Sequence, residues 1–244
     1  MQTLVAIPVY NEAEYVAGVL EEVRRYATDV LVVDDGSTDG TSAVLAGFEG
    51  IQVIRHPENR GYGQSLIDAF RFADCRGYDW IITIDCDEQH EPAGIPEFIR
   101  RAAADDVDIV SGSRYLADMA GNTVAPEDRR AINRRITRIL NERLDLNLTD
   151  AFCGFKAYRV CAMASLDLTV PGYAFPLQFW VQAVRRGLRI CELPVPLIYH
   201  DPTRHFGGLL DDPEARLQHY LEVFEAEMAR PFPPQTPCAA RRRR

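Results

Sequence analysis

The chain reads Trp80-Ile81-Ile82-Thr83-Ile84 and continues directly with Asp85-Cys86-Asp87, so that two carboxylates follow an apolar run. A run that does not alternate apolar with polar residues is typical of a strand covered on both faces of a sheet. In an extended segment residues i and i+2 point to the same face, so both aspartates can bind one cation. Oxygen ligands of this kind suit Mg²⁺ or Mn²⁺. Since Asp-x-Asp is also common in acidic surface loops, the pair by itself is not specific.

Similar apolar runs alternate with helical patterns on both sides of this segment. The predicted strands span residues 3–7, 30–33, 51–54, 80–84 and 107–110. Between them, apolar residues recur at about i, i+3 and i+4, which predicts helices over residues 14–25, 41–47, 63–73 and 95–104. Residues 212–230 have the pattern of a further amphipathic helix, which we expect to pack on the domain or on a partner subunit. The alternation predicts an α/β fold with a mostly parallel twisted sheet flanked by helices.

Length, charge and cysteine content exclude several classes of protein. With 244 residues, 47% of them hydrophobic and 26% charged, the chain suits one large domain that can bury a substantial core. Its net charge of −9 argues against a nucleic-acid-binding protein. The cysteines form no Cys-x-x-Cys pair and no zinc-binding spacing, and no apolar stretch is long enough to span a bilayer. We therefore expect a cytoplasmic protein, with the proline-rich and arginine-rich residues 231–244 as a disordered tail.

The loops after four of the predicted strands carry most of the chemically useful side chains. They lie at residues 8–12, 34–41, 60–63 and 85–87. Taken one at a time, each loop reads as an ordinary turn or helix start. In a parallel sheet, however, ligands bind beyond the carboxyl ends of the strands, where these loops converge. Aspartates there can accept hydrogen bonds from a base or a ribose, and a tyrosine can stack on a base, so the set predicts a nucleotide site.

The order and spacing of these motifs resemble those of family 2 glycosyltransferases of the GT-A fold: Pro8-Val-Tyr-Asn-Glu12, Asp34-Asp-Gly-Ser37 and Asp85-Cys-Asp87. Residues 87–89, 109–115, 150–158 and 172–175 narrow the resemblance to dolichyl-phosphate mannosyltransferases and related polyprenyl-phosphate glycosyltransferases. It covers residues 3–208. The resemblance implies an inverting enzyme that transfers a sugar, mannose or glucose being expected, from a donor such as GDP-mannose or UDP-glucose. It also implies one GT-A domain over residues 1–230, with the nucleotide-sugar half at 1–115 and the acceptor half at 116–230.

The resemblance implies a role for each matching residue of this chain. By analogy, the nucleotide base and ribose are held by Pro8, Tyr10, Glu12 and Asp35. The Asp85-Cys86-Asp87 motif would bind the diphosphate, with Asp85, Asp87 and Gln89 as ligands of Mg²⁺ or Mn²⁺. Arg114 and Arg204 match arginines that meet phosphates of the donor or acceptor, and the expected catalytic residues are Asp87, Arg114 and Asp150. A metal and guanidinium groups would stabilise the charge on the departing nucleoside diphosphate.

The need for a general base depends on the acceptor. A lipid phosphate is already anionic and can attack the anomeric carbon unaided, in which case Asp150 mainly positions other groups. A hydroxyl acceptor must lose its proton, and Asp150 is then the best candidate base. The segment Gly154-Phe-Lys156 reads either as a turn that lines the acceptor site or as a plain bend.

Three departures from the family pattern concern the acceptor. The late loop reads Arg204-His-Phe-Gly207-Gly-Leu-Leu210, so that Leu209 and Leu210 stand where a serine and a lysine are expected near phosphate. Gln178 stands where related sequences often carry glutamate. The chain also has no C-terminal transmembrane helices. Each departure weakens the expectation of a lipid-phosphate acceptor, and none affects the donor side.

Two other functions stay open at this point. A nucleotidyltransferase also combines an α/β fold with metal-binding aspartates, but it needs a glycine-rich basic loop that residues 8–12 do not provide. A catalytically silent sugar-nucleotide-binding or scaffold subunit would be consistent with the altered late loop. For the enzyme, the expected partners are a nucleotide sugar and a polyprenyl-phosphate acceptor or membrane partner protein. Peripheral binding to the membrane and a homo-oligomer are further expectations.

Overall fold

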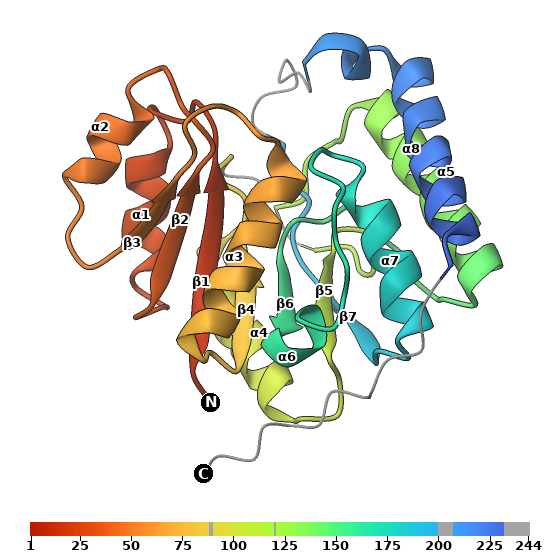
Figure 1. Cartoon of the computed structure of the whole chain (residues 1–244), viewed down its shortest axis with the longest axis horizontal. Coiled ribbons are helices and arrows are strands. Elements are labelled where there is room, and N and C mark those ends of the chain that lie inside the picture. The colour runs from red at the N-terminus through yellow and green to blue at the C-terminus, as the bar shows by residue number, and fades with distance from the viewer. Residues whose placement is uncertain (88–89, 120, 200–206, 232–244) are drawn as a thin grey trace.

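A seven-stranded sheet forms the centre of the protein, with the strand order β3-β2-β1-β4-β6-β5-β7 (Figure 1). The computed structural model describes residues 1–87, 90–119, 121–199 and 207–231. The strands are β1 (Thr3–Val9), β2 (Val30–Asp34), β3 (Gln52–Arg55), β4 (Trp80–Thr83), β5 (Ile109–Ser113), β6 (Lys156–Arg159) and β7 (Ile190–Pro194). Neighbouring strands run parallel, except that β6 is antiparallel to both β4 and β5. This sheet confirms the predicted mostly parallel α/β fold and each of the predicted strands.

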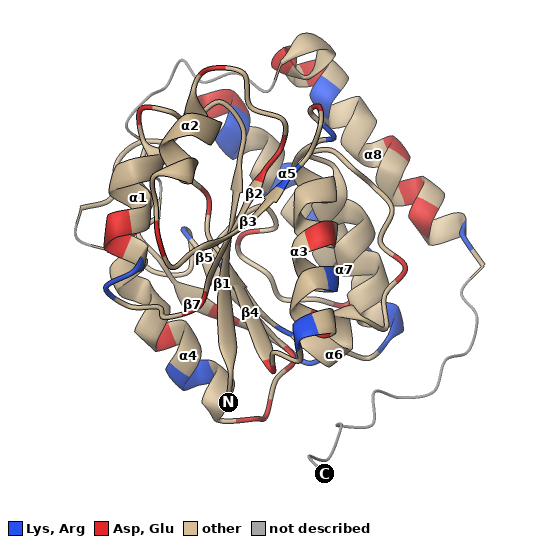
Figure 2. Cartoon of the chain, turned by 60° about the vertical axis from the view of Figure 1, so that its left-hand side comes forward, with Lys and Arg blue, Asp and Glu red and all other residues tan. Residues whose placement is uncertain are grey.

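Helices cover both faces of the sheet. They are α1 (Val16–Val23), α2 (Thr41–Ala46), α3 (Tyr62–Arg76), α4 (Ile95–Ala103), α5 (Glu127–Leu144), α6 (Val160–Met163), α7 (Phe175–Arg185) and α8 (Pro213–Ala229), with 3₁₀ turns η1 (Pro92–Gly94) and η2 (Gly208–Asp211). Figure 2 shows α1, α2 and α4 on one side of the sheet and α3, α6 and α7 on the other. Each layer has its own apolar core, because the strands of the middle of the sheet present buried side chains to both faces.

The edge strand β3 departs from the pattern of the central strands. Its residues alternate between half-buried and exposed, whereas every residue of β2 and β4 is buried. Ile54 packs on the core, but Val53 is 45% exposed. The prediction that all apolar runs are covered on both faces is therefore wrong for β3, since helices cover only one of its faces.

Helix α8 packs on the domain, as its amphipathic pattern predicts. Asp212 accepts a hydrogen bond from the Ala215 N–H, and Pro213 occupies the first turn, where a missing N–H costs nothing. Tyr220 and Phe224 are buried in the core between α8 and the neighbouring helices α5 and α7. In the described part of the chain, none of the helices combines the length and the apolar composition needed to cross a membrane.

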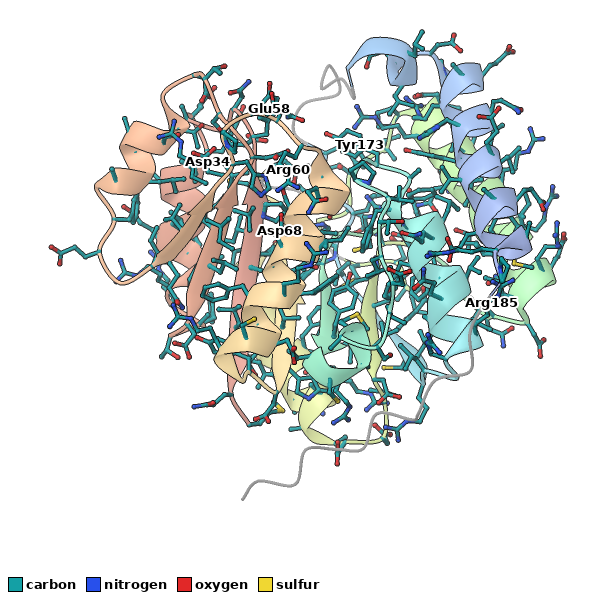
Figure 3. All side chains as sticks on the ribbon, viewed as in Figure 1. Asp34, Glu58, Arg60, Asp68, Tyr173 and Arg185 are labelled. Carbon is teal, nitrogen blue, oxygen red and sulfur yellow. The ribbon has the colours of Figure 1, made fainter. Side chains whose placement is uncertain are left out.

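Buried polar contacts fix the C-terminal half of α8. Glu227 accepts hydrogen bonds from the amide groups of Gln178 and Gln182, at 2.9 and 2.8 Å. Arg185 on α7, labelled in Figure 3, lies close to α8. It donates to the carbonyl groups of Glu227 and Arg230, at the end of α8. Gln178 therefore faces the Glu227 carboxylate of α8. A glutamate in its place would bring two buried negative charges face to face. The departure at Gln178 is explained by helix packing, so it no longer bears on the acceptor.

Candidate active site

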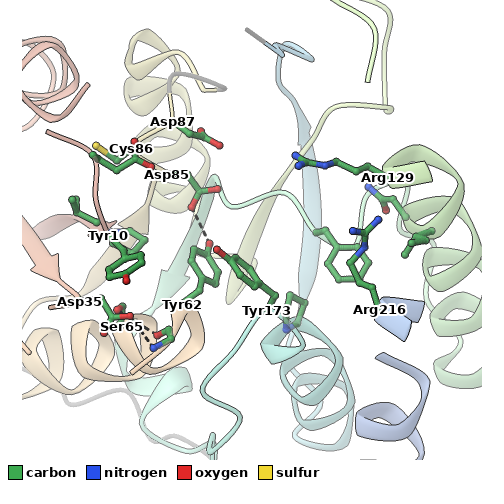
Figure 4. A pocket seen from close by; sticks show the side chains of 18 of the residues that line it. Tyr10, Asp35, Tyr62, Ser65, Asp85, Cys86, Asp87, Arg129, Tyr173 and Arg216 are labelled. Atoms are coloured by element: carbon green, nitrogen blue, oxygen red, sulfur yellow. Dashed lines mark hydrogen bonds between the residues drawn. The ribbon is translucent and has the colours of Figure 1, made fainter. Parts of the chain in front are cut away.

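A cavity of about 360 Å³ opens at the carboxyl ends of β1, β2 and β4 (Figure 4). It brings together eight residues predicted from the sequence: Pro8, Tyr10, Glu12, Asp35, Asp85, Cys86, Asp87 and Arg114. Asp150 lies behind the wall rather than on it, while Gln89 and Arg204 fall outside the described residues. The convergence arises because parallel strands direct their C-terminal loops to one edge of the sheet.

Asp35, at the end of β2, holds the loop that leads into α3. Its two carboxylate oxygens accept hydrogen bonds from the N–H groups of Arg60 and Gly61, both at 2.8 Å. His56 Nδ1 lies 2.6 Å from the same carboxylate. Tyr10, which follows β1, is 44% exposed at the cavity. The geometry thus offers an exposed ring on one wall and, beside it, a carboxylate that is already hydrogen-bonded to backbone.

Tyr62 links the start of α3 to the aspartate motif. Its hydroxyl group donates a 2.9 Å hydrogen bond to Asp85 Oδ1, and its ring stacks on that of Tyr173 with centroids 5.8 Å apart. Burial and the neighbouring Asp85 carboxylate raise the pKa of Tyr62 well above its usual value, so its hydroxyl remains a donor. Gly61 precedes it with φ of 99°, and a Cβ there would lie 2.5 Å from the Pro171 carbonyl oxygen. The Gly-Tyr-Gly sequence therefore both opens a helix and positions a cavity residue.

Asp85 is set in a polar environment that keeps it ionised. Its Oδ2 lies 3.5 Å from His90 Nε2, and its side chain is 25% exposed. Burial alone would raise the pKa of Asp85, but hydrogen bonding and charge from His90, followed by Tyr62 and Lys156, lower it below its usual value. An ionised carboxylate at the cavity is the form that binds a divalent cation.

Gly154 forms the support beneath Asp85. A Cβ at this position would lie 1.9 Å from Asp85 Oδ2, and the Gly154 carbonyl accepts a 2.7 Å hydrogen bond from the hydroxyl of Thr83. Lys156, the only lysine of the chain, is buried next to this turn and donates to the Cys153 carbonyl. The segment is thus more than a plain bend, because the close approach of the Asp85 carboxylate requires its glycine.

Replacing Gly154 with alanine is expected to lower turnover about 100-fold, because the added methyl group must displace the Asp85 carboxylate. Initial rates with saturating nucleotide sugar would measure the effect, and far-UV circular dichroism would report the fold. Gly94 to alanine is the matched control, since a Cβ there meets only the ring edge of Phe155, at 3.0 Å. Wild-type turnover in the Gly154 variant would show that Asp85 can move without loss of function.

Arg114 and Asp150 form a buried bidentate ion pair. Arg114 Nε and Nη2 donate to the two Asp150 oxygens at 2.7 and 3.0 Å, and Asn133 Nδ2 donates to Oδ1 at 2.7 Å. Asp150 is fully buried, whereas Arg114 is 8% exposed and lines the cavity. Burial alone would raise the pKa of Asp150, but the charge and hydrogen bonds of Arg114 outweigh it and hold that pKa well below its usual value. This geometry suits a carboxylate that orients Arg114. The same contacts leave the Asp150 carboxylate with little basicity.

Several residues that line the cavity were not predicted from the sequence. Figure 4 shows Tyr10 and Asp35 on one side, Arg129 and Arg216 on the other, and Tyr62 and Tyr173 between them. The walls here are completed by Tyr115, Ile132, Phe152, Pro176, Tyr199 and Tyr220. Arg129 lies in α5 among several other arginines, and Arg216 lies in α8 among acidic and apolar residues. No spacing in the sequence separates either of them from ordinary surface residues. Only their placement against the cavity identifies them.

The carboxylate oxygens of the site fit a divalent cation whose remaining coordination positions would be filled by oxygen atoms of a bound substrate or of water. Asp85 and Asp87 both line the cavity, and carboxylate oxygens are preferred by Mg²⁺ and Mn²⁺. Among the described residues, no cluster of three or more His, Cys, Asp and Glu side chains is arranged around a single metal position. Mg²⁺ commonly binds through one or two carboxylates together with phosphate oxygens and water, which agrees with a two-carboxylate site.

Comparison with known proteins places this geometry in a family. A sequence model described as Glycosyl transferase family 2 matches residues 4–166. The undecaprenyl-phosphate mannosyltransferase of Micrococcus luteus is 32% identical over 224 residues, which cover 87% of this chain and 90% of that protein. The polyprenol monophosphomannose synthase of Mycolicibacterium smegmatis is 30% identical over 206 residues, covering 80% of this chain and 76% of that protein.

Solved structures share the fold at low sequence identity. Glucosyl-3-phosphoglycerate synthase from Mycobacterium tuberculosis, in complex with Mn²⁺, UDP and phosphoglyceric acid, superposes with a TM-score of 0.72 at 18% identity. The match covers 95% of this chain and 80% of that chain. Mannosyl-3-phosphoglycerate synthase from Rubrobacter xylanophilus gives 0.71 at 17% identity, covering 93% of this chain and 74% of that chain. The architecture is therefore the GT-A fold, and the chain belongs to glycosyltransferase family 2, in agreement with its loop motifs.

Proposed function

We propose that this glycosyltransferase transfers a hexose, mannose or glucose, from a nucleoside diphosphate sugar to the phosphate group of a polyprenyl phosphate, with inversion at the anomeric carbon. The observation that carries the proposal is a single cavity with two chemically different ends. Figure 4 shows the carboxylates of Asp85 and Asp87 toward one end and the guanidinium groups of Arg129 and Arg216 at the other. Donor and acceptor bound at these two ends would meet between them.

On the donor side, Asp35, Glu12 and Tyr10 would bind the base and ribose, and the Asp85-Cys86-Asp87 segment would face the diphosphate. Mg²⁺ or Mn²⁺ held by Asp85 and Asp87, with Gln89 as a further ligand, would neutralise the charge that develops on the leaving nucleoside diphosphate. Tyr62 keeps Asp85 oriented through its 2.9 Å hydrogen bond.

On the acceptor side, the state of Asp150 supports a phosphate nucleophile. A hydroxyl acceptor would need a base in contact with it, and Asp150 is fully buried, paired with Arg114, and has a depressed pKa. A phosphate monoester is already anionic and needs no base, so Asp150 would act by holding Arg114 toward the cavity. The names of the two curated relatives, an undecaprenyl-phosphate mannosyltransferase and a polyprenol monophosphomannose synthase, agree with a lipid-phosphate acceptor.

Two measurements test the proposal. Thermal melting with GDP-mannose, UDP-glucose and other nucleotide sugars, each with and without Mn²⁺, would identify the donor, because a ligand bound by the folded state raises its stability. The identified donor would then be incubated with farnesyl phosphate, farnesol and 3-phosphoglycerate. We expect a glycosylated product from farnesyl phosphate alone. Transfer to farnesol instead would show a hydroxyl acceptor, and tight donor binding without any transfer would show a silent subunit.

Asp150 to asparagine separates the two acceptor chemistries. If Asp150 only orients Arg114, the variant should keep measurable transfer to farnesyl phosphate, with a rate that has the same pH dependence as the wild type. If Asp150 is a base, turnover should vanish while donor binding persists.

A further inference from the structure

Helix α8 places a buried arginine at the cavity. Arg216 is 3% exposed and lies one turn before Tyr220, which lines the same wall. Its Nη1 donates to the Leu210 carbonyl at 2.8 Å, and its Nη2 donates to Asp128 Oδ2 at 2.6 Å. These two contacts fix the guanidinium plane, because each involves a different terminal nitrogen. Arginine is seldom buried so completely, so its position at a cavity calls for an explanation.

A second arginine reaches the same part of the cavity from another helix. Arg129 lies in the first turn of α5, and its guanidinium carbon is 6.0 Å from the centre of the Tyr199 ring. Figure 4 shows Arg129 and Arg216 facing the same region of the cavity, on the side away from Tyr10 and Asp35. Two cations from separate helices thus converge where no nucleotide motif lies.

The labelled aspartates and arginines of the cavity lie apart: Figure 4 shows Asp35, Asp85 and Asp87 away from Arg129 and Arg216. Among the described lining residues, the acidic ones are Glu12, Asp35, Asp85 and Asp87, and the basic ones are Arg114, Arg129 and Arg216. Asp150 accepts hydrogen bonds from Nε and Nη2 of Arg114, so the contribution of Arg114 to an incoming anion is reduced. In a chain with a net charge of −9, a cavity end with this concentration of cations is suited to an anion.

Apolar side chains stand next to these arginines. Phe152 and Tyr220 stack with ring centroids 5.1 Å apart, and Ile132 lies on the same wall. Phosphate bound by arginine alone would need no such surface, whereas a phosphate attached to an isoprenoid chain would bury apolar area against it. The combination of cations and aromatic rings matches the two ends of a lipid phosphate.

We infer that Arg216, together with Arg129, binds the phosphate monoester of the acceptor, a role that rests on the proposed function. The subsite is built between α5 and α8, so the C-terminal helix contributes directly to acceptor recognition. A purely structural reading is that Arg216 ties α8 to α5 through Asp128. The two readings differ in which kinetic constant responds to substitution.

Arg216 to methionine is expected to raise the KM for farnesyl phosphate by about 10- to 100-fold, the loss expected for a charge-assisted hydrogen bond, while the KM for the donor stays unchanged. Arg129 to methionine should act in the same direction. Asp128 to asparagine is the first control, because it breaks the same ion pair but leaves the cation in place. Arg143 to methionine is the second, since Arg143 pairs with Glu225 across the same two helices without lining the cavity. Neither control should raise the acceptor KM.

Binding measurements made without the donor show whether the subsite recognises a lipid phosphate or phosphate alone. They do not depend on turnover. Isothermal titration of the wild type and the Arg216 variant would use farnesyl phosphate, inorganic phosphate and farnesol. Weaker farnesyl phosphate binding in the variant, with no binding of farnesol to either, supports a lipid-phosphate subsite. Equal binding of inorganic phosphate and farnesyl phosphate to the wild type, again weakened in the variant, supports a subsite for phosphate alone.

The two hypotheses can fail separately. If the wild type transfers no sugar but its farnesyl phosphate binding still requires Arg216, the subsite stands and the proposed function falls. If the wild type transfers sugar and the Arg216 variant has the same acceptor KM as the Arg143 variant, the inference is overturned. The same holds if the Asp128 and Arg216 variants raise the acceptor KM equally, because the ion pair itself would then be responsible.

Discussion

Replacing Asp87 with alanine is expected to lower sugar transfer by about 10²- to 10³-fold and to leave the fold intact. Asp87 lines the cavity in the same motif as Asp85, so its loss would remove one of two carboxylates available to a divalent cation. Charge on the departing nucleoside diphosphate would then be stabilised less in the transition state than in the wild type. Initial rates with the identified donor and farnesyl phosphate, over a range of Mn²⁺ concentrations, would measure the loss.

A second readout for this variant does not depend on activity. In the wild type, Mn²⁺ added with the nucleoside diphosphate should raise the melting temperature, and the Asp87 variant should lose most of the Mn²⁺-dependent increment. Asp106 to alanine is the matched control, since this aspartate is exposed and pairs with Arg101. It precedes the amino end of β5, whereas the cavity lies at the carboxyl ends of the strands. Full activity in the Asp87 variant would exclude a metal role for this residue.

Arg114 to methionine is expected to destabilise the protein by about 3–5 kcal/mol, because it leaves Asp150 as a buried carboxylate without its cation. Urea unfolding at pH 7, followed by fluorescence, would measure the free energy of unfolding. Arg138 to methionine provides the comparison, because Arg138 is 69% exposed and its contact with Glu142 is 3.9 Å long. An exposed pair of this kind contributes about 0–1 kcal/mol.

The pH dependence of this destabilisation has a defined sign. In the wild type the pKa of Asp150 is depressed from its ordinary value of 3.8. The stabilisation from the ion pair is therefore fully present above pH 3.8 and is lost as the pH falls through the depressed value. In the Arg114 variant, burial without a cation raises that pKa, so destabilisation should be largest near neutral pH and should shrink on acidification. A loss that grew on acidification would contradict the assignment.

A double variant separates the stability of the pair from its function. Arg114 to methionine combined with Asp150 to leucine removes both charges, and buried pairs replaced by apolar residues are often as stable as the original. We expect most of the lost stability to return. Sugar transfer should not return, since Arg114 lines the cavity and its predicted contact with phosphate is absent in both variants. Recovery of transfer would limit Arg114 to a structural role.

The first five strands in the sequence were predictable because each of them contains a short run of mostly apolar residues. Strands β6 and β7 were not predicted. Lys156–Arg159 carries a charge at each end, and Ile190–Pro194 contains a glutamate and a proline, so neither segment has a periodicity that separates it from a loop. Lys156 is accommodated in a strand only because tertiary packing buries its side chain beside the Trp180 ring.

The two sides of the cavity also differ in how much of them was predictable from the sequence. On the side proposed to bind the donor, Asp35, Asp85 and Asp87 follow strands directly or closely, so their meeting at one edge depends only on the strands being parallel. On the side proposed to bind the acceptor, Leu209 stands where a serine was expected and is 85% exposed, and Arg204 lies outside the described residues. From motifs alone, this side could be described only by the serine and lysine that are absent from its late loop.

The sequence by itself determined the α/β class and the family, and it predicted that Asp35, Asp85 and Asp87 meet, because these depend on local patterns and on loops that follow strands. The tertiary structure decided the partners of the buried charges of Arg114 and Arg216. Arg114 and Asp150 are 36 residues apart, and Arg216 and Asp128 are 88 apart, yet each pair is in hydrogen-bond contact. The first pair lies beside the paired strands β5 and β6, and the second meets only when helices α5 and α8 have packed together. Local sequence does not encode that packing, because it is set by the apolar surface that the whole fold buries.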